Sequence, residues 1–281
     1  MISICQCLGY LETPLSTPGY EHLREVPNNS SGIDPLNPKS RELIQAMVDD
    51  VLALMPNVKR FHLGGDEART LGQNPETEAY MEKHGKGALY LQHVGPILDN
   101  LNKRKIRPIL WHDMMIDWDS KALKSLGSKC DLMMWGYGGD PAKGGKHINS
   151  DMMKRFAEHD IVLWGATAYK GAEGYDADTP DIPLHVANAK AWVEVGRRFG
   201  FAGVVATGWS RYAVDTVQCN PIDSSLDSAL MVAVILHDGQ PPAQGEEACV
   251  EALALLGEKE RFVACRDVMR RLRDLRRAGW E

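Results

Sequence analysis

Short apolar runs alternate with amphipathic stretches along most of the chain. The apolar runs predict strands at residues 2–8, 58–65, 107–111, 131–135, 161–166 and 204–207. The amphipathic stretches predict helices at 40–55, 76–103 (broken around Gly85-Lys86-Gly87), 120–126, 150–158, 184–199, 225–237, 246–256 and 258–277. Short strands that are apolar throughout and alternate with helices are typical of a parallel sheet with helices on both faces.

Two of the predicted helices have a distinct apolar face. In the helix at 40–55, Ser40 is the expected N-cap, and the expected buried face consists of Leu43, Met47, Val51 and Leu54. In the last helix, the expected buried face consists of Phe262, Cys265, Met269 and Leu272. The arginines of that helix fall mostly on its other faces, so we expect it to pack on the fold with a solvated basic side.

The order of elements indicates an α/β fold of the TIM-type (β/α) barrel class. A closed barrel of this class has eight strands, whereas about six are predicted here, so we expect an incomplete barrel. We assign residues 1–240 to a barrel domain that lacks its first strands, and residues 241–281 to a C-terminal helical segment packed on the barrel. No linker, composition shift or internal repeat marks a further domain.

Composition and charge argue against several classes of function. The 281 residues carry a formal net charge of −6, whereas nucleic-acid-binding proteins usually present a basic face. No apolar run approaches the roughly 20 residues that span a membrane, and the N-terminus lacks the features of a secretory signal. We therefore expect a cytoplasmic protein with reduced cysteines. The 6 cysteines include no CxxC pair, and no ligand spacing indicates a metal site.

Polar and aromatic residues follow the predicted strands at their C-terminal ends, where parallel α/β folds place the active site. They are His62 to Glu67, Trp111-His112-Asp113, Trp135-Gly136-Tyr137, Thr167-Ala168-Tyr169 and Gly208 to Tyr212. A single tryptophan usually fills a core. Three tryptophans and several ionisable groups at matching strand ends predict a sugar pocket, because indole rings stack on the apolar faces of a pyranose and carboxylates bind its hydroxyls.

The strongest chemical signal is Asp66-Glu67, which follows Gly64-Gly65. Most glycosidases place two carboxyl groups about 5 Å or about 6.5–9.5 Å apart, usually on different strands. Adjacent residues on a strand point to opposite faces, so this pair suits another division of labour. Glu67 would protonate the leaving oxygen, and Asp66 would hold a substrate group that acts as the nucleophile. The two glycines permit the irregular backbone that such an arrangement needs.

Residues 62–67, His-Leu-Gly-Gly-Asp-Glu, are identical to the signature of the glycoside hydrolase family 20 β-N-acetylhexosaminidases. The resemblance also includes Pro35-Leu36-Asn37-Pro38, Trp111-His112-Asp113, Trp135 and residues 207–212, and so covers most of residues 1–240. The chain resembles the hexosaminidase D-like group most closely. The hexapeptide is a specific signal, whereas single tryptophan positions are not.

This resemblance implies removal of terminal β-linked N-acetylglucosamine or N-acetylgalactosamine from a glycoside or glycoconjugate, without a cofactor or metal. The substrate's 2-acetamido oxygen would attack the anomeric carbon and form an oxazolinium-type intermediate, which is an exception to the two-carboxylate scheme. In the family's pattern Glu67 is the general acid and later the base, and Asp66 accepts the acetamido N–H. Tyr169 is the candidate hydroxyl for the acetamido carbonyl, and Tyr137 is the alternative.

The resemblance also implies a set of substrate-binding residues, namely His62, Trp111, Asp113, Trp135, Tyr137, Trp209 and Arg211. The tryptophans would wall the acetamido pocket and the sugar face. Asp113 and Arg211 would contact hydroxyls or orient Glu67, and a structural ion pair is an equal alternative. His62 is expected to be a buried, hydrogen-bonded residue behind the site rather than a catalyst.

Two departures from the family's pattern affect the prediction. The family usually has a histidine where Tyr10 stands. Its first two strands and first helix, which include an arginine that binds sugar hydroxyls, have no counterpart, so we expect an N-terminally truncated barrel. Homodimerisation would cover the open sheet edges of such a barrel. The alternatives to a hexosaminidase are therefore a non-catalytic relative that binds amino sugars, and another barrel hydrolase such as a chitinase-like enzyme.

Overall fold

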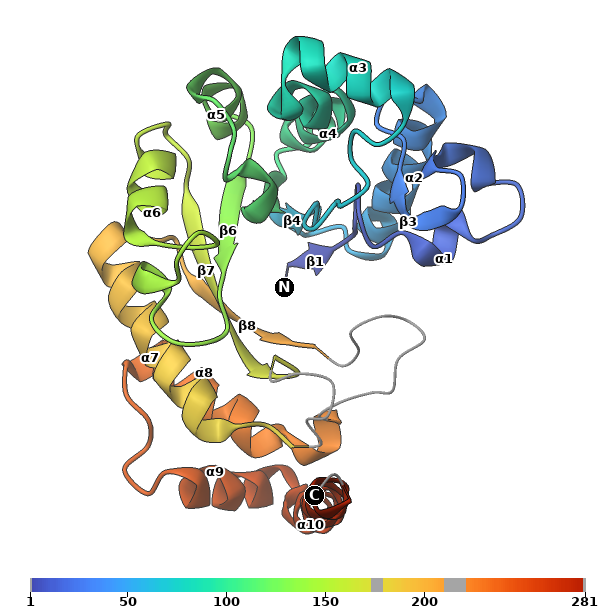
Figure 1. Ribbon diagram of the computed structural model, residues 1–281. Helices are drawn as coiled ribbons and strands as arrows, with labels where there is room; N and C mark the ends of the chain where they lie inside the picture. The colour runs from blue at the N-terminus through green and yellow to red at the C-terminus, as the bar shows by residue number, and fades with distance from the viewer. Residues whose placement is uncertain (1, 173–178, 210–220, 280–281) are drawn as a thin grey trace. The chain divides into compact units, whose positions relative to one another are not determined.

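The computed structural model describes residues 2–172, 179–209 and 221–279. The chain forms two compact units (Figure 1). The first unit contains Met1–Met134 and Asp151–Leu163, and the second contains Trp135–Ser150 and Trp164–Glu281. The boundary that the sequence suggests at residue 240, between a barrel and a C-terminal segment, stays a prediction.

Six strands of the described residues form one sheet: β1 (Ser3–Ile4), β4 (Arg60–His62), β5 (Arg107–Trp111), β6 (Asp131–Trp135), β7 (Leu163–Lys170) and β8 (Val204–Gly208). Their order in the sheet follows their order in the chain. The neighbours β1 and β4, β4 and β5, β5 and β6, and β7 and β8 pair in parallel. At least one helix lies between every two successive strands, so the α/β fold of an incomplete TIM-type barrel is confirmed.

From residue 38 to β7 the helices are α2 (Pro38–Leu54), α3 (Pro75–His84), α4 (Lys86–Lys103), η2 (Asp113–Met115), α5 (Ser120–Gly127) and α6 (Ser150–Ala157), with the short helix η3 (Pro141–Lys143) before α6. Figure 1 shows α3 beside α4, and α4 also packs on β5. The predicted break between α3 and α4 is confirmed at Gly85. This residue has a φ of 88°, which glycine adopts at little cost.

Helix α2 has a different cap and a different buried face from those predicted. Asn37, not Ser40, is the N-cap, because its side chain accepts a hydrogen bond from Lys39 N at 3.0 Å and Pro38 starts the first turn. The buried face consists of Ser40, Ile44, Val48 and Leu52. Leu54 is 85% exposed. The apolar arc of this helix is wide enough for two stripes, and packing against α4 selects the second of them.

The second unit contains β7 and β8 with α7 (Ile182–Phe199), α8 (Leu226–Asp238), α9 (Glu246–Ala252), α10 (Lys259–Ala278) and the short helices η4 (Ile222–Ser224) and η5 (Leu253–Leu256). Asp181 caps α7 by accepting a hydrogen bond from Leu184 N at 3.1 Å, and Gly200 ends the helix in the left-handed conformation. Helices α7 and α8 lie side by side (Figure 1). Together with α9 they share a core of Ala189, Met231, Val232, Ile235 and Cys249.

Arginines line the inner face of α10, where the sequence predicted apolar residues. The Arg266 side chain is only 14% exposed, and its Nη1 lies 3.2 Å from Glu246 Oε1 and 3.7 Å from Asp227 Oδ2. Arg270 Nη2 lies 2.9 Å from the same Glu246 oxygen. Asp227 is buried, and a buried carboxylate needs charged or hydrogen-bonding partners. This requirement turns the arginines inward.

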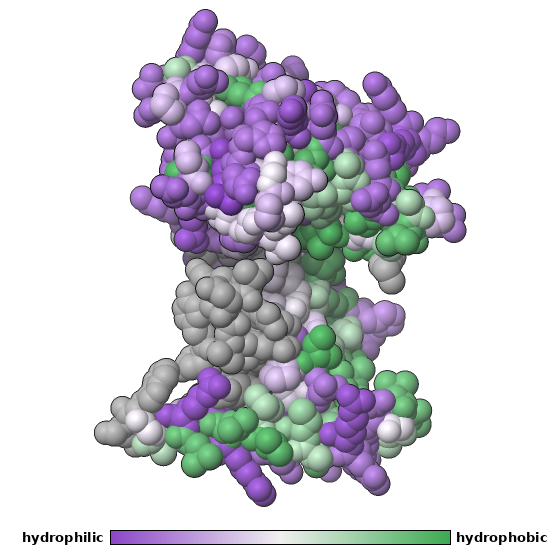
Figure 2. Space-filling model, turned by 90° about the vertical axis from the view of Figure 1, so that its right-hand side faces the viewer, coloured by the Kyte–Doolittle hydropathy of each residue, from purple (hydrophilic) through white to green (hydrophobic). Residues whose placement is uncertain are grey.

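The outer face of α10 is mixed: Arg271 and Arg276 are exposed, as predicted for a solvated basic side, but apolar residues are exposed beside them. Val268, Leu272 and Leu275 follow one another at helical spacing and are 56%, 42% and 70% exposed. Figure 2 shows hydrophobic side chains at the level of this helix. Phe262 is buried, as predicted.

The segment before α2, where the sequence predicts neither a helix nor a strand, contains regular structure. It forms α1 (Glu12–Leu15), η1 (Glu21–Leu23) and an antiparallel hairpin of β2 (Arg24–Val26) and β3 (Asn29–Ile33). These strands are short and mostly polar, so they lack the hydrophobic alternation from which strands are predicted.

Glu25 of β2 is a buried carboxylate that ties this hairpin to the segment before α3. Its Oε1 accepts hydrogen bonds from the backbone N–H groups of Gly72 at 3.0 Å, Gln73 at 2.9 Å and Asn74 at 3.2 Å, and from the hydroxyl of Thr77. Its Oε2 accepts one from Asn74 Nδ2 at 2.8 Å. A carboxylate can be buried when it is hydrogen-bonded in this way, so tertiary contacts stabilise a hairpin that its own sequence does not favour.

Replacing Glu25 by alanine should destabilise the protein strongly. The Glu25→Ala variant should lose about 3 kcal/mol of unfolding free energy, because several buried donors lose their acceptor. Urea unfolding followed by circular dichroism measures this loss. The matched variant Glu42→Ala, at an exposed position of α2, should change the free energy by no more than about 0.5 kcal/mol. Similar losses in the two variants would contradict the role of Glu25.

Candidate functional site

The backbone after β4 curls through a short series of left-handed residues. Gly64, Gly65 and Glu67 have φ angles of 61°, 78° and 43°. A Cβ atom on Gly64 would lie 1.8 Å from Gln6 Oε1, and one on Gly65 would lie 2.1 Å from Tyr90 Oη. Both positions therefore require glycine, for the conformation and for the space. This curl, which we call the signature loop (residues 63–67), ends strand β4 earlier than the sequence suggested.

Asp66 is buried and held by the end of the neighbouring strand. Its Oδ1 accepts a hydrogen bond from Gln6 Nε2 at 3.0 Å, and Gln6 Oε1 accepts one from Gly65 N at 3.0 Å. Burial raises the pKa of Asp66 to about 6, and the charges of Asp113 and Glu67 act in the same direction, whereas the bond from Gln6 opposes them. Asp66 is thus a fixed carboxyl group that becomes ionised near neutral pH.

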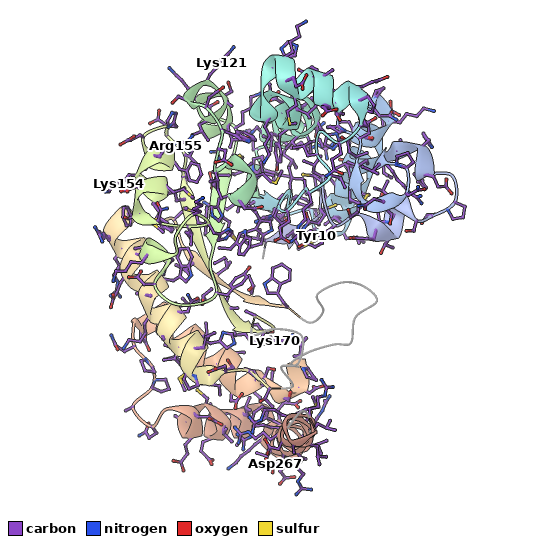
Figure 3. All side chains as sticks on the ribbon, in the orientation of Figure 1. Tyr10, Lys121, Lys154, Arg155, Lys170 and Asp267 are labelled. Atoms are coloured by element: carbon purple, nitrogen blue, oxygen red, sulfur yellow. The ribbon has the colours of Figure 1, made fainter. Side chains whose placement is uncertain are left out.

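Glu67 has a different environment from its neighbour, because its left-handed backbone turns the side chain toward solvent. The side chain is 29% exposed, and its Oε1 lies 3.2 Å from Arg69 Nη2. Its Oε2 accepts a hydrogen bond from the Tyr10 hydroxyl, and its backbone N–H donates to Asp113 Oδ2 at 2.9 Å. Figure 3 shows Tyr10 on the side of the first unit away from α3. Asp113 holds the backbone of Glu67, and Tyr10 and Arg69 hold its carboxyl group.

His62 and Trp111 pack together beneath the signature loop. Their ring centroids lie 4.4 Å apart, and both side chains are buried. His62 Nδ1 accepts a hydrogen bond from Gly64 N at 2.9 Å, and burial lowers the pKa of His62 to about 3, so the ring is neutral with its proton on Nε2. Within the described residues, His62 Nε2 and Trp111 Nε1 have no hydrogen-bond partner. Buried donors of this kind are usually satisfied by water or a ligand.

The second unit carries an aromatic cluster at the ends of its strands. The rings of Trp135 and Tyr137 are stacked with centroids 5.5 Å apart, and Tyr137 meets Trp209 edge-on at 6.4 Å. His147 packs on Trp135 at 3.9 Å, and its Nε2 lies 3.1 Å from the Trp135 carbonyl oxygen. Trp209 is 37% exposed. A partly exposed group of aromatic rings provides faces on which a sugar can stack.

Two residues at the end of β7 fix the surroundings of this cluster. Tyr169 is partly buried, which raises the pKa of its phenol, and its carbonyl oxygen accepts a hydrogen bond from Ser228 Oγ at 2.7 Å. Lys170, labelled in Figure 3, is fully buried, and its Nζ donates to the Trp209 carbonyl oxygen at 2.7 Å. The predicted site residue Arg211 lies outside the described residues.

The structure thus brings the predicted residues together in two groups, one in each unit. His62, Asp66, Glu67, Trp111 and Asp113 belong to the first, and Trp135, Tyr137, Tyr169 and Trp209 to the second. Among the residues that contact these groups, the sequence analysis assigned no role to Gln6, Arg69 and His147, and it noted Tyr10 only as a departure from the family's pattern. The sequence could have indicated Gln6, because this residue lies at the end of a strand that neighbours the strand before Asp66 in a parallel sheet. No sequence signal indicated the contact of His147 with Trp135.

Two other kinds of feature are absent from the described residues. Among these residues no three His, Cys, Asp or Glu side chains are grouped so that they could hold a metal ion. No helix in the described ranges combines the length and the apolar character needed to cross a membrane.

The sequence matches one family model and two curated relatives. The model described as "Glycosyl hydrolase family 20, catalytic domain" matches residues 13–169. Two proteins named Hexosaminidase D are similar over 250 residues, with 29% identity in Homo sapiens and 28% in Bos taurus. The matches cover 85% and 84% of this chain but 51% and 71% of those proteins. The chain therefore spans about half the length of the human relative.

A solved structure has a similar fold. The crystal structure of a β-N-acetylhexosaminidase from Bacteroides fragilis matches with a TM-score of 0.60 and 16% identity, covering 91% of this chain and 52% of that chain. Identity at this level shows the fold alone. The matched fold agrees with the parallel strands and the alternating helices described above.

The raised pKa of Asp66 predicts a pH dependence of stability. The folded state binds the Asp66 proton more tightly than the unfolded chain does, because folding raises its pKa from 3.8 to about 6. The contribution of Asp66 to the free energy of unfolding is fully present below the pKa of Asp66 in the unfolded chain, and it is lost as the pH rises through about 6. This contribution amounts to roughly 3 kcal/mol.

Urea unfolding at about pH 4 and about pH 7.5 measures the effect. The Asp66→Asn variant should lose less stability over this interval than the unmodified protein. The variant Asp117→Asn, at an exposed position of the same unit, should lose as much as the unmodified protein. An unchanged pH dependence in Asp66→Asn would show that Asp66 titrates as it does in the unfolded chain.

Proposed function

Because the chain belongs to glycosyl hydrolase family 20, we propose that it removes terminal β-linked N-acetylglucosamine or N-acetylgalactosamine from glycosides or glycoconjugates. The two relatives named Hexosaminidase D support this activity. The observation that carries the proposal is the contrast between two adjacent carboxyl groups. Asp66 is buried and bound by Gln6, whereas Glu67 is partly exposed. The first is suited to hold a substrate group in place, and the second to exchange a proton with the substrate.

In the proposed reaction the substrate's acetamido oxygen attacks the anomeric carbon while the bond to the leaving oxygen breaks. Glu67 gives its proton to that oxygen, so the leaving group departs as a neutral alcohol. Asp66 accepts a hydrogen bond from the acetamido N–H, and its charge balances the positive oxazolinium-type intermediate. Water then attacks the anomeric carbon and loses a proton to Glu67, which restores the acetamido group and the acid.

The environment of Asp66 suits this division of labour. Its carboxyl group is ionised above a pH of about 6, as the role of charge-balancing acceptor requires. The bond from Gln6 occupies Oδ1 and fixes the orientation of the group, so Oδ2 is the oxygen that would accept the acetamido N–H. A carboxylate fixed before the substrate binds needs little reorganisation during the reaction.

The remaining roles in the proposal follow the residues that the sequence suggested. Asp113 orients the backbone of Glu67, and Trp111 with His62 supports the signature loop from beneath. The aromatic cluster of the second unit, Trp135, Tyr137 and Trp209, binds the sugar face. Tyr169 donates to the acetamido carbonyl, with Tyr137 as the alternative, and Arg211 contacts sugar hydroxyls.

The proposal predicts an absolute dependence on the acetamido group. An aryl N-acetyl-β-hexosaminide should be hydrolysed, whereas the matching aryl β-hexoside, with a hydroxyl in place of the acetamido group, should remain uncleaved because it lacks the nucleophile. Release of the aryl alcohol measures both rates. Equal rates would rule out the substrate-assisted mechanism. Absence of turnover with both substrates, together with binding of a thiazoline mimic of the intermediate, would indicate a non-catalytic sugar-binding protein.

Two variants separate the roles of the adjacent carboxyl groups. Glu67→Gln should lose about 100-fold or more in kcat/KM with a poor leaving group, and much less with an activated aryl leaving group that needs no proton. Asp66→Asn should reduce both rates to a similar extent, because it disturbs the nucleophile itself. Small and equal losses in the two variants would count against the assignment.

A further inference from the structure

Tyr10 and Glu67 form a contact between two strained positions. Among the described residues, four non-glycine residues have a positive φ, and Tyr10 (54°) and Glu67 (43°) are two of them. The hydroxyl of the first donates to the carboxyl group of the second. Residues keep such backbone conformations only where their surroundings impose them, and they are concentrated at functional sites.

The backbone that carries Tyr10 is anchored on both sides of the contact. Leu8 O accepts a hydrogen bond from Ile33 N at 3.2 Å, and Leu11 N donates to Ser31 O at 3.1 Å, so strand β3 holds this segment. Gly9 lies against the signature loop, because a Cβ atom there would sit 2.8 Å from the Asp66 carbonyl oxygen. The Tyr10 phenol is therefore presented to Glu67 by a fixed piece of backbone.

The chemistry of the pair gives each partner one role. Partial burial and the neighbouring Glu67 carboxyl group raise the pKa of Tyr10 far above its usual value, so its hydroxyl stays protonated and acts as a donor. Arg69 also contacts Glu67, but its side chain is 71% exposed, and an exposed ion pair is weakened by solvent and salt. Tyr10 is thus the partner that restricts the carboxyl group most.

We propose that Tyr10 is a positioning residue for Glu67, an inference that rests on the proposed function. Its hydroxyl holds Oε2 and fixes the side-chain rotamer, so that proton transfer to and from the substrate uses Oε1. When Glu67 gives its proton to the leaving oxygen, the Tyr10 hydroxyl stabilises the resulting carboxylate. Tyr10 keeps its own proton throughout, so the proton balance of the reaction is unchanged.

The Tyr10→Phe variant tests this role, because it removes the hydroxyl and keeps the ring. With a poor leaving group kcat/KM should fall about 10-fold or more, and with an activated aryl leaving group by no more than about 3-fold. The alkaline limb of the pH profile should move to higher pH, because the ionised form of Glu67 has lost a donor. Circular dichroism of the variant establishes that it is folded.

The matched control is Tyr20→Phe, which removes a hydroxyl from a tyrosine of similar exposure in the same unit (39%, against 44% for Tyr10). It should leave both rates and the pH profile unchanged. If Glu67→Gln abolishes turnover but Tyr10→Phe behaves like Tyr20→Phe, the positioning role is wrong and the proposed function stands. If the unmodified chain turns over no substrate, the proposed function and this inference both fail.

A spectroscopic titration tests the contact itself without any turnover. The difference in ultraviolet absorbance between the unmodified protein and Tyr10→Phe follows the ionisation of the Tyr10 phenol. The same difference can be measured between Glu67→Gln and the double variant Tyr10→Phe/Glu67→Gln. In the Glu67→Gln background the Tyr10 phenol should ionise at lower pH, because the negative charge and the hydrogen-bond acceptor of the Glu67 carboxylate have been removed. An unchanged titration would mean that Tyr10 and Glu67 do not interact, which overturns the inference.

Discussion

The two hydrogen bonds of the Gln6 side chain are the constraint on which the site depends. The amide accepts from the Gly65 N–H and donates to Asp66, so it fixes the backbone of the signature loop and the carboxyl group that follows it. Gln6 reaches this loop because β1 and β4 pair in parallel, with Ile4 opposite His62. Once Asp66 is held inward, the left-handed backbone of Glu67 directs the next side chain outward, toward Tyr10.

This arrangement explains how adjacent residues can have different chemistry. On a regular strand, Asp66 and Glu67 would differ only in the face to which they point. Here the curled backbone buries one carboxyl group among other acids and exposes the other to donors. Beneath them, burial keeps His62 neutral, so this ring adds no positive charge to the environment of Asp66.

Features that depend on local sequence could be predicted. Strands β5 and β6 were located residue for residue, the break at Gly85 was found, and the hexapeptide at 62–67 indicated the family that the matches confirm. Features set by distant partners could not be predicted. The hairpin around Glu25 and the contact between Tyr10 and Glu67 join residues roughly fifty positions apart, and only the register of the folded chain brings them together. The roles of the individual site residues stay predictions.

The inward arginines of α10 mean that the two units respond differently to the solution around them. Ionic contacts from Arg266 and Arg270 to Asp227 and Glu246 fasten this helix, whereas apolar contacts dominate the packing of α4. Dissolved salt weakens partly exposed ionic contacts and leaves apolar ones largely intact. The attachment of α10 is therefore more sensitive to ionic strength than the packing of α4, and release of this helix would remove the basic partner of the buried Asp227.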